Sequence, residues 1–157
     1  AAAAGTVGEL RFDPFAMLPF CGYNMADYFA HWLDIGRQAD ADKLPRFFYV
    51  NWFRKGADGK FLWPGFGDNS RVLEWVFERC AGRGDAVKTA IGYLPAKGAI
   101  PTEGTGMSDD AMDELLGVDV EGWRAELPSI AEHLDHLGDR VPSQLHDQLS
   151  ELEKRLS

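Results

Sequence analysis

The residues best suited to do chemistry lie at 51–69, a stretch with five large aromatic side chains and four glycines. Glycine, proline and an Asp-Gly pair separate the aromatic residues, so their rings cannot share one face of a regular helix or strand. The rings must be presented from bends in the chain, where planar side chains can stack on a planar ligand. The stretch therefore indicates a site that holds a flat ring, such as a nucleotide base.

A stacked base in this stretch could also be read by hydrogen bonds. Phe53 and Phe66 could face each other across a gap one ring thick, with Phe61 contributing an edge. Each aromatic platform contributes about 1–3 kcal/mol to holding a base, whichever base it is. Selectivity needs polar contacts, and Asn69 supplies a carboxamide next to glycines that leave the backbone approachable. Because guanine and adenine reverse donor and acceptor on one edge, such a site could separate them.

Three plainer interpretations of the same residues stay open at this point. The aromatic side chains could fill a small core beneath an irregular loop, since burial is the commonest fate of such residues. Asn69 could be only a helix cap. The aromatic surface would also suit a protein-interaction module that binds no nucleotide, because aromatic residues are enriched at interfaces. Spacing alone does not decide among them.

Charge and hydropathy exclude some classes of function. The net charge is −9, and residues 101–157 hold 14 Asp and Glu against 4 Lys and Arg, whereas residues 1–100 are nearly balanced. A chain with an acidic tail and no basic stripe is a poor nucleic-acid binder, because phosphate neutralisation supplies most of that affinity. No apolar run approaches the roughly 18 residues of a membrane span, and the first residues lack the pattern of a signal peptide. We expect a cytoplasmic protein without membrane or nucleic-acid partners.

Cysteine and histidine do not predict a metal site in this chain. Cys21 and Cys80 have apolar neighbours in the sequence and lack the CxxC spacing of a metal or redox centre. We expect both to be buried, reduced thiols. His133 and His136 lie three residues apart, but no third ligand follows at a recognised spacing.

The elements that must position these residues form an α+β segment, rich in helices with short strands. The pattern of residues 72–80 predicts that Val72, Leu73, Val76, Phe77 and Cys80 form the buried stripe of one helix. The predicted elements begin with a helix from Asn24 to Gly36, a strand Phe47–Phe53 against which Lys60–Trp63 pairs back, and a helix that starts at 68–70 and ends at Gly82. A strand Ala90–Leu94, an irregular connection 97–106 and a helix capped by Ser108 follow. Two helices over 123–137 and 145–156 then pair as a hairpin, and Pro128 kinks or restarts the first of them.

Several of these segments together resemble one enzyme family, GTP-dependent phosphoenolpyruvate carboxykinase. The matching segments are residues 13–17, 19–24, 48–54, 60–75 and 91–93, the longest beginning Lys60-Phe-Leu-Trp-Pro-Gly-Phe-Gly-Asp-Asn69. The resemblance is strong over residues 1 to about 95 and weaker through the acidic tail. It implies that residues 1–157 form the C-terminal part of the mixed α/β nucleotide-binding domain of that fold, in a monomeric parent enzyme. Within it, residues 1–9 would belong to a lid, 46–80 to the guanine pocket and 107–157 to the helical tail.

The resemblance assigns separate roles to the aromatic residues. The family converts oxaloacetate and GTP to phosphoenolpyruvate, GDP and carbon dioxide, the committed step of gluconeogenesis, using Mn²⁺ and Mg²⁺. It implies that Phe53 and Phe66 sandwich the guanine ring, that Phe61 lines the pocket, that Asn69 hydrogen-bonds the base and that Trp52 lies beside the nucleotide.

Other parts of the active site are implied at the start of the chain or outside it. Phe20 matches an aromatic residue near oxaloacetate or phosphoenolpyruvate, although Cys21 stands where the family often has a second aromatic residue. The first nine residues, with Ala1, Ala2, Ala3, Ala4 and Gly5 at their head, match a mobile lid that keeps water from the enolate intermediate. The phosphate-binding loop, the metal ligands and the arginines that hold the acid substrate find no match here. The resemblance places them in the preceding part of the same enzyme, so we expect this segment alone to be inactive.

Overall fold

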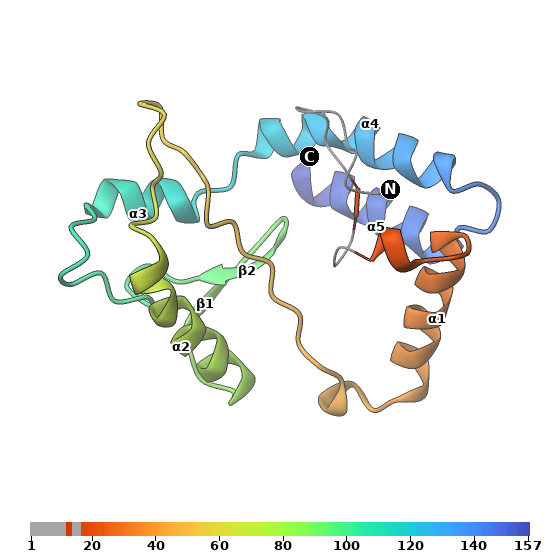
Figure 1. Ribbon diagram of the computed structural model, residues 1–157, viewed down its shortest axis with the longest axis horizontal. Coiled ribbons are helices and arrows are strands. Elements are labelled where there is room, and N and C mark those ends of the chain that lie inside the picture. Colours follow the sequence, from red (N-terminus) through yellow and green to blue (C-terminus); the bar gives the residue numbers. More distant parts are fainter. Residues whose placement is uncertain (1–11, 14–16) are drawn as a thin grey trace. The chain divides into compact units, whose positions relative to one another are not determined.

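The computed structural model describes residues 12, 13 and 17–157, which fall into two compact units. One unit contains the described residues up to Leu44 together with Val120–Ser157, and the other is Pro45–Asp119. Helices dominate both, and the described residues contain one two-stranded antiparallel sheet (Figure 1). This is the helix-rich α+β composition that the sequence predicts.

The first unit is built from α1 (Met25–Gln38), α4 (Val120–His136) and α5 (Ser143–Leu156). Asn24 connects two of them, because its Oδ1 accepts from the backbone N–H of Ala26 at 2.8 Å while its Nδ2 donates to the carbonyl of Leu137 at 2.8 Å. The same side chain thus caps the start of α1 and holds the end of α4. The buried residues of this unit are Met25, Ala26, Leu134 and Leu156.

The two C-terminal helices confirm the predicted helical hairpin. In Figure 1, α4 and α5 lie side by side and run in opposite directions, joined by a turn in which Gly138 has φ +79°. The apolar repeat of α5 faces the unit, since Leu145, Leu149 and Leu152 are half-buried and Leu156 is fully buried. The helix α4 continues through Pro128 instead of restarting there.

The second unit holds α2 (Asn69–Cys80), the hairpin of β1 (Ala86–Thr89) and β2 (Gly92–Pro95), and α3 (Asp109–Leu116). Ser108 caps α3 as predicted, accepting from the N–H of Ala111 at 3.2 Å. The predicted strand at 90–94 is shifted, because residues 90 and 91 form the turn between two shorter strands. The core of the unit is a cluster of buried side chains: Trp63, Trp75, Ile100 and Met112.

The predicted strand Phe47–Phe53 is wrong for the chain as described. Residues 46–50 belong to no helix or strand, and a turn follows at 52–53. Strand propensity expresses packing against neighbouring strands, and a segment without a partner strand does not form a ladder. The predicted pairing of Lys60–Trp63 is limited to a single antiparallel bridge between Lys55 and Phe61.

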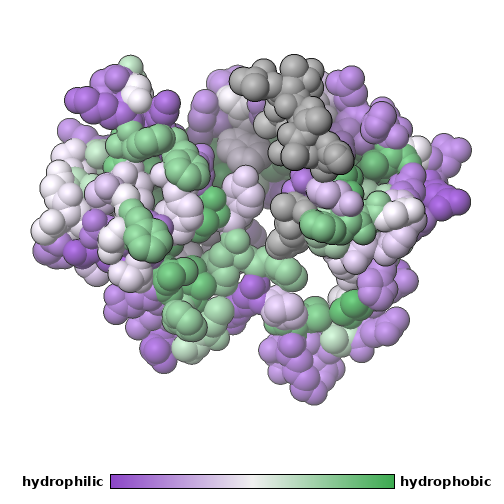
Figure 2. All heavy atoms as spheres, viewed as in Figure 1, coloured by the Kyte–Doolittle hydropathy of each residue, from purple (hydrophilic) through white to green (hydrophobic). Residues whose placement is uncertain are grey.

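The predicted buried stripe of α2 is wrong for three of its five residues. Val72 and Val76 are half-buried against the core, and Trp75, between them on the same face, is buried. Leu73 and Phe77 are instead 51% and 75% exposed, and Cys80 is exposed, whereas Cys21 is half-buried; both cysteines are free thiols. Positions 73, 77 and 80 form a second stripe, next to the one that Trp75 anchors. In Figure 2, green spheres, which mark hydrophobic residues, lie open at the surface around α2.

Candidate functional site

A tight turn brings two of the predicted ring-binding residues together. Backbone hydrogen bonds join Gly56 N–H to the carbonyl of Lys60 and Leu62 N–H to that of Arg54, both at 2.9 Å. This pairing sets Phe61 opposite Lys55, and the ring of Phe61 contacts that of Phe53, with centroids 6.0 Å apart and planes at 63°. The two rings meet edge to face, so one face of the pair stays available.

The three predicted phenylalanines are exposed. The exposed fractions are 72% for Phe53, 57% for Phe61 and 92% for Phe66. Phe66 opens a short 3-10 helix, Phe66–Asp68, that follows Gly65. Gly65 has φ +129° and ψ −169°, a conformation that essentially only glycine adopts. A group of bare rings within one short stretch is typical of a binding surface, so these side chains do not form the small core that composition alone allowed.

Asn69 is held by a core tryptophan. Its Oδ1 accepts from the indole Nε1–H of Trp63 at 2.8 Å, and Trp63 is only 6% exposed. Asn69 is the first residue of α2, and its backbone N–H donates to the carbonyl of Phe66. The side chain therefore bonds to an indole, and the simple helix-cap interpretation does not describe it. The sequence contained both residues of this pair, but their six-residue separation across a turn gave no signal of contact.

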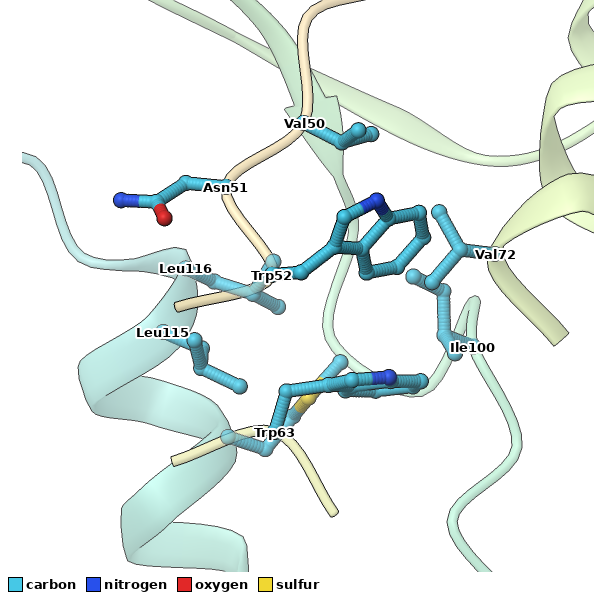
Figure 3. A pocket seen from close by; sticks show the side chains of 9 residues that line it. Val50, Asn51, Trp52, Trp63, Val72, Ile100, Leu115 and Leu116 are labelled. Carbon is cyan, nitrogen blue, oxygen red and sulfur yellow. The ribbon is translucent and has the colours of Figure 1, made fainter. Parts of the chain in front are cut away.

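Trp52 faces inward, behind Phe53. Its ring lies 6.3 Å from that of Trp63 at an angle of 45°, and the two indoles border an apolar cavity of about 120 Å³ (Figure 3). Figure 3 shows Val72 and Ile100 on one side of this cavity, and the amide of Asn51 directed away from it. That amide accepts from the N–H of Phe53 at 3.0 Å, which fixes the turn that exposes Phe53. The remaining residues that line the cavity are Val50, Met112, Leu115 and Leu116.

Two arginines hold this framework, Arg71 and Arg54, and the sequence predicted this role for neither. The Arg71 side chain pairs with Asp68 at 3.0 Å and donates to the carbonyls of Pro101 and Glu103 at 3.1 and 2.9 Å. It ties the turn that carries Phe66 to the irregular connection after β2. Arg54 donates to the carbonyls of Leu115 and Gly117, at the end of α3. The spacing of Asp68 and Arg71, three residues apart at the start of a helix, was the available signal for the first of these.

Basic side chains also border the exposed rings. The Lys55 Nζ lies over the ring of Phe61, 5.4 Å from its centroid, in a cation–π contact. Lys60 pairs with Asp58 at 3.4 Å on the exposed turn. The turn therefore combines aromatic surface with positive charge.

The other predicted site residues are not in the second unit. Phe20 is 88% exposed, at the end of a 3-10 helix, Leu18–Phe20, in the first unit. Asp13 steadies that helix, since its Oδ1 accepts from the N–H of Leu18 at 2.8 Å. The predicted lid residues Ala1, Ala2, Ala3, Ala4 and Gly5, like the rest of 1–9, lie outside the described residues.

Comparison with known proteins identifies the family to which this arrangement belongs. Residues 1–155 match the model of the phosphoenolpyruvate carboxykinase C-terminal P-loop domain. The chain belongs to this family. The phosphoenolpyruvate carboxykinase [GTP] of Treponema pallidum (strain Nichols) is 58% identical over 152 residues, which cover 96% of this chain and 25% of that protein. The proteins of the same name from Chlamydia muridarum and Neocallimastix frontalis are 52% and 50% identical over 157 residues, each covering 99% of this chain and 26% of the relative.

The match confirms the family resemblance and sets its extent. The chain spans about a quarter of the length of the curated carboxykinases that it matches. None of the described helices combines the length and apolar character that a membrane span requires. Within the same part of the chain, no three His, Cys, Asp or Glu side chains gather where they could hold a metal ion.

Proposed function

We propose that this chain supplies the guanine-binding surface of a GTP-dependent phosphoenolpyruvate carboxykinase, a decarboxylating lyase. The parent enzyme would convert oxaloacetate and GTP to phosphoenolpyruvate, GDP and carbon dioxide. The observation that carries the proposal is the exposure of Phe53, Phe61 and Phe66 on a framework whose other aromatic residues, Trp52 and Trp63, are packed inward. The names of the relatives, which include GTP, agree with a purine ligand.

The exposed rings provide the stacking part of the site. The rings of Phe53 and Phe66 are exposed, so their faces are available to a ligand, and Phe61 adds its edge beside Phe53. Each base-stacking contact contributes about 1–3 kcal/mol, so two platforms give useful affinity without distinguishing bases. Lys55, beside Phe61, adds positive potential that favours a ligand carrying phosphates.

Asn69 provides the base-selective part. Its half-buried amide lies at the start of α2, directly after the turn that carries Phe66. A hydrogen bond from this amide to a purine edge distinguishes bases that stacking alone treats alike. We assign to Asn69 the recognition of guanine.

The remaining expectations from the resemblance are part of the same proposal. Phe20, exposed in the first unit, would border the acid substrate, and residues 1–9 would form part of the lid that excludes water. The described residues bring together no ligand set for Mn²⁺ or Mg²⁺, so we assign no metal-dependent step to this chain. The phosphate loop and metal ligands would come from the rest of the parent enzyme.

One observation favours a different class of function. Leu73 and Phe77 form an exposed apolar stripe on α2 that is not part of the proposed guanine site. Such a stripe is expected of a module that binds another protein. A nucleotide-binding site and an interaction module differ in their response to nucleotide.

Thermal protection of the full-length protein separates the two functions. At constant Mn²⁺, GDP at about 100 times its Kd should stabilise the protein by about 2.7 kcal/mol and raise its melting temperature, because GDP binds only the folded state. ADP at the same concentration should protect far less. Equal melting temperatures with GDP, with ADP and without nucleotide would contradict the proposed function and favour the interaction module.

A further inference from the structure

The hydrogen bond between Trp63 and Asn69 joins the core to the proposed site. Trp63 belongs to the cluster of Trp75, Ile100 and Met112, and its indole is nearly inaccessible to solvent. Its Nε1 nevertheless reaches the Asn69 side chain at 2.8 Å. Close packing fixes the indole ring, so the direction of its N–H bond is fixed as well.

The chemistry of this pair determines which way the Asn69 amide is turned. An indole nitrogen can only donate a hydrogen bond, so the atom that it meets must be the amide oxygen. The amino group, Nδ2, then occupies the other branch of the amide. It makes no hydrogen bond to the described residues, and no buried side-chain nitrogen or oxygen among them lacks a partner, so this amino group is not fully buried.

We propose that Trp63 is the positioning residue that makes the site selective for purines with a 6-oxo group. The inference rests on the proposed function, in which Asn69 contacts the base. With its oxygen engaged by Trp63, Asn69 presents two N–H donors to the ligand. Those donors match the O6 acceptor of guanine and oppose the 6-amino group of adenine, which is itself a donor.

Loss of the indole N–H should therefore reduce selectivity more than it reduces binding. Without that donor, the amide of Asn69 can rotate by half a turn and present its oxygen instead, which accepts from the amino group of adenine. The stacking surfaces of Phe53 and Phe66 are unchanged and hold either base. A residue that only filled the core would weaken GDP and ADP binding alike.

The test compares two core tryptophans in the full-length protein. Trp63→Phe removes the N–H that reaches Asn69, whereas Trp75→Phe removes an N–H that donates to the backbone carbonyl of Asp85 at 3.0 Å. Both residues are buried in the same cluster, at 6% and 7% exposure, so the two variants lose similar packing. The ratio of the Kd for ADP to that for GDP, measured on one preparation, does not depend on the fraction of protein that is folded.

We expect this ratio to fall by about 3- to 10-fold in Trp63→Phe, which is the change in affinity that the loss of one hydrogen bond causes. In Trp75→Phe the ratio should stay at the wild-type value. In an Asn69→Ala background, Trp63→Phe should not change the ratio further, because its effect passes through that amide. An unchanged ratio in Trp63→Phe, or the same fall in Trp75→Phe or in the Asn69→Ala background, overturns the role of Trp63. A wild-type protein without preference for GDP contradicts the proposed function itself.

Discussion

Replacement of Phe66 by alanine isolates the stacking contribution that the proposed site depends on. Phe66 is 92% exposed, so its ring contributes little to the stability of the free protein, and we expect Phe66→Ala to change the free energy of unfolding by no more than about 0.5 kcal/mol. In the complex, the same ring would cover one face of guanine. Loss of that platform costs about 1–3 kcal/mol, which corresponds to a rise in the Kd for GDP of roughly 5- to 150-fold.

The assay is a fluorescence titration of the full-length protein with a GDP analogue that carries a fluorophore on its ribose. Phe77→Ala is the matched control, because Phe77 is also a largely exposed phenylalanine, at 75%, but lies on α2 outside the proposed site. We expect the control to keep the wild-type Kd. Equal affinities for the two variants would refute the argument that the exposed rings of residues 53–66 stack on the base, even if the protein binds GDP elsewhere.

Two further predictions concern the framework and the first unit. Gly65→Ala should distort the turn before Phe66, since a side chain at φ +129° and ψ −169° costs of order 1–3 kcal/mol, and faster backbone hydrogen–deuterium exchange over 61–75 should show it. Gly67→Ala, where a Cβ meets open space and φ is not positive, should exchange as wild type does; equal exchange in both variants counts against the strain. Burial, and to a smaller extent the nearby His136, lower the pKa of His133. The rate of hydrogen–deuterium exchange at its imidazole, measured against pH, should therefore have its midpoint below pH 6.5. The folded state then binds its proton less readily than the unfolded state, so the first unit loses stability as the pH falls through 6.5, and a His133 pKa at or above 6.5 would contradict this.

The sequence predicted well those elements whose signals are local. The cap at Ser108, the start of α2 near Asn69 and the leucine repeat of α5 each depend on residues within one or two turns of chain. The ring-rich stretch was also recognisable, because glycines and an Asp-Gly pair separate its aromatic residues. The structure shows that its phenylalanines are exposed, and their contact with guanine stays a prediction.

The errors concern properties that depend on distant partners. Phe47–Phe53 has strand-forming residues, but a strand needs a neighbour, and the described chain provides only the bridge between Lys55 and Phe61. The predicted buried stripe of α2 was too wide, because the periodicity of the sequence allowed both Val76 and Phe77 to be buried. In the structure Val76 packs against the core beside Trp75, and Phe77 is exposed. The hydrogen bond between Trp63 and the Asn69 side chain could not be foreseen, because six residues and a turn separate the two.

The most direct test of the central claim is a crystal structure of the full-length protein with GDP and Mn²⁺. We predict that the guanine ring lies between Phe53 and Phe66, with its O6 within hydrogen-bond distance of Asn69 Nδ2 and with the bond from Trp63 Nε1 to Asn69 Oδ1 intact. A guanine ring bound elsewhere, or bound here with the oxygen of Asn69 turned toward O6, would contradict the account.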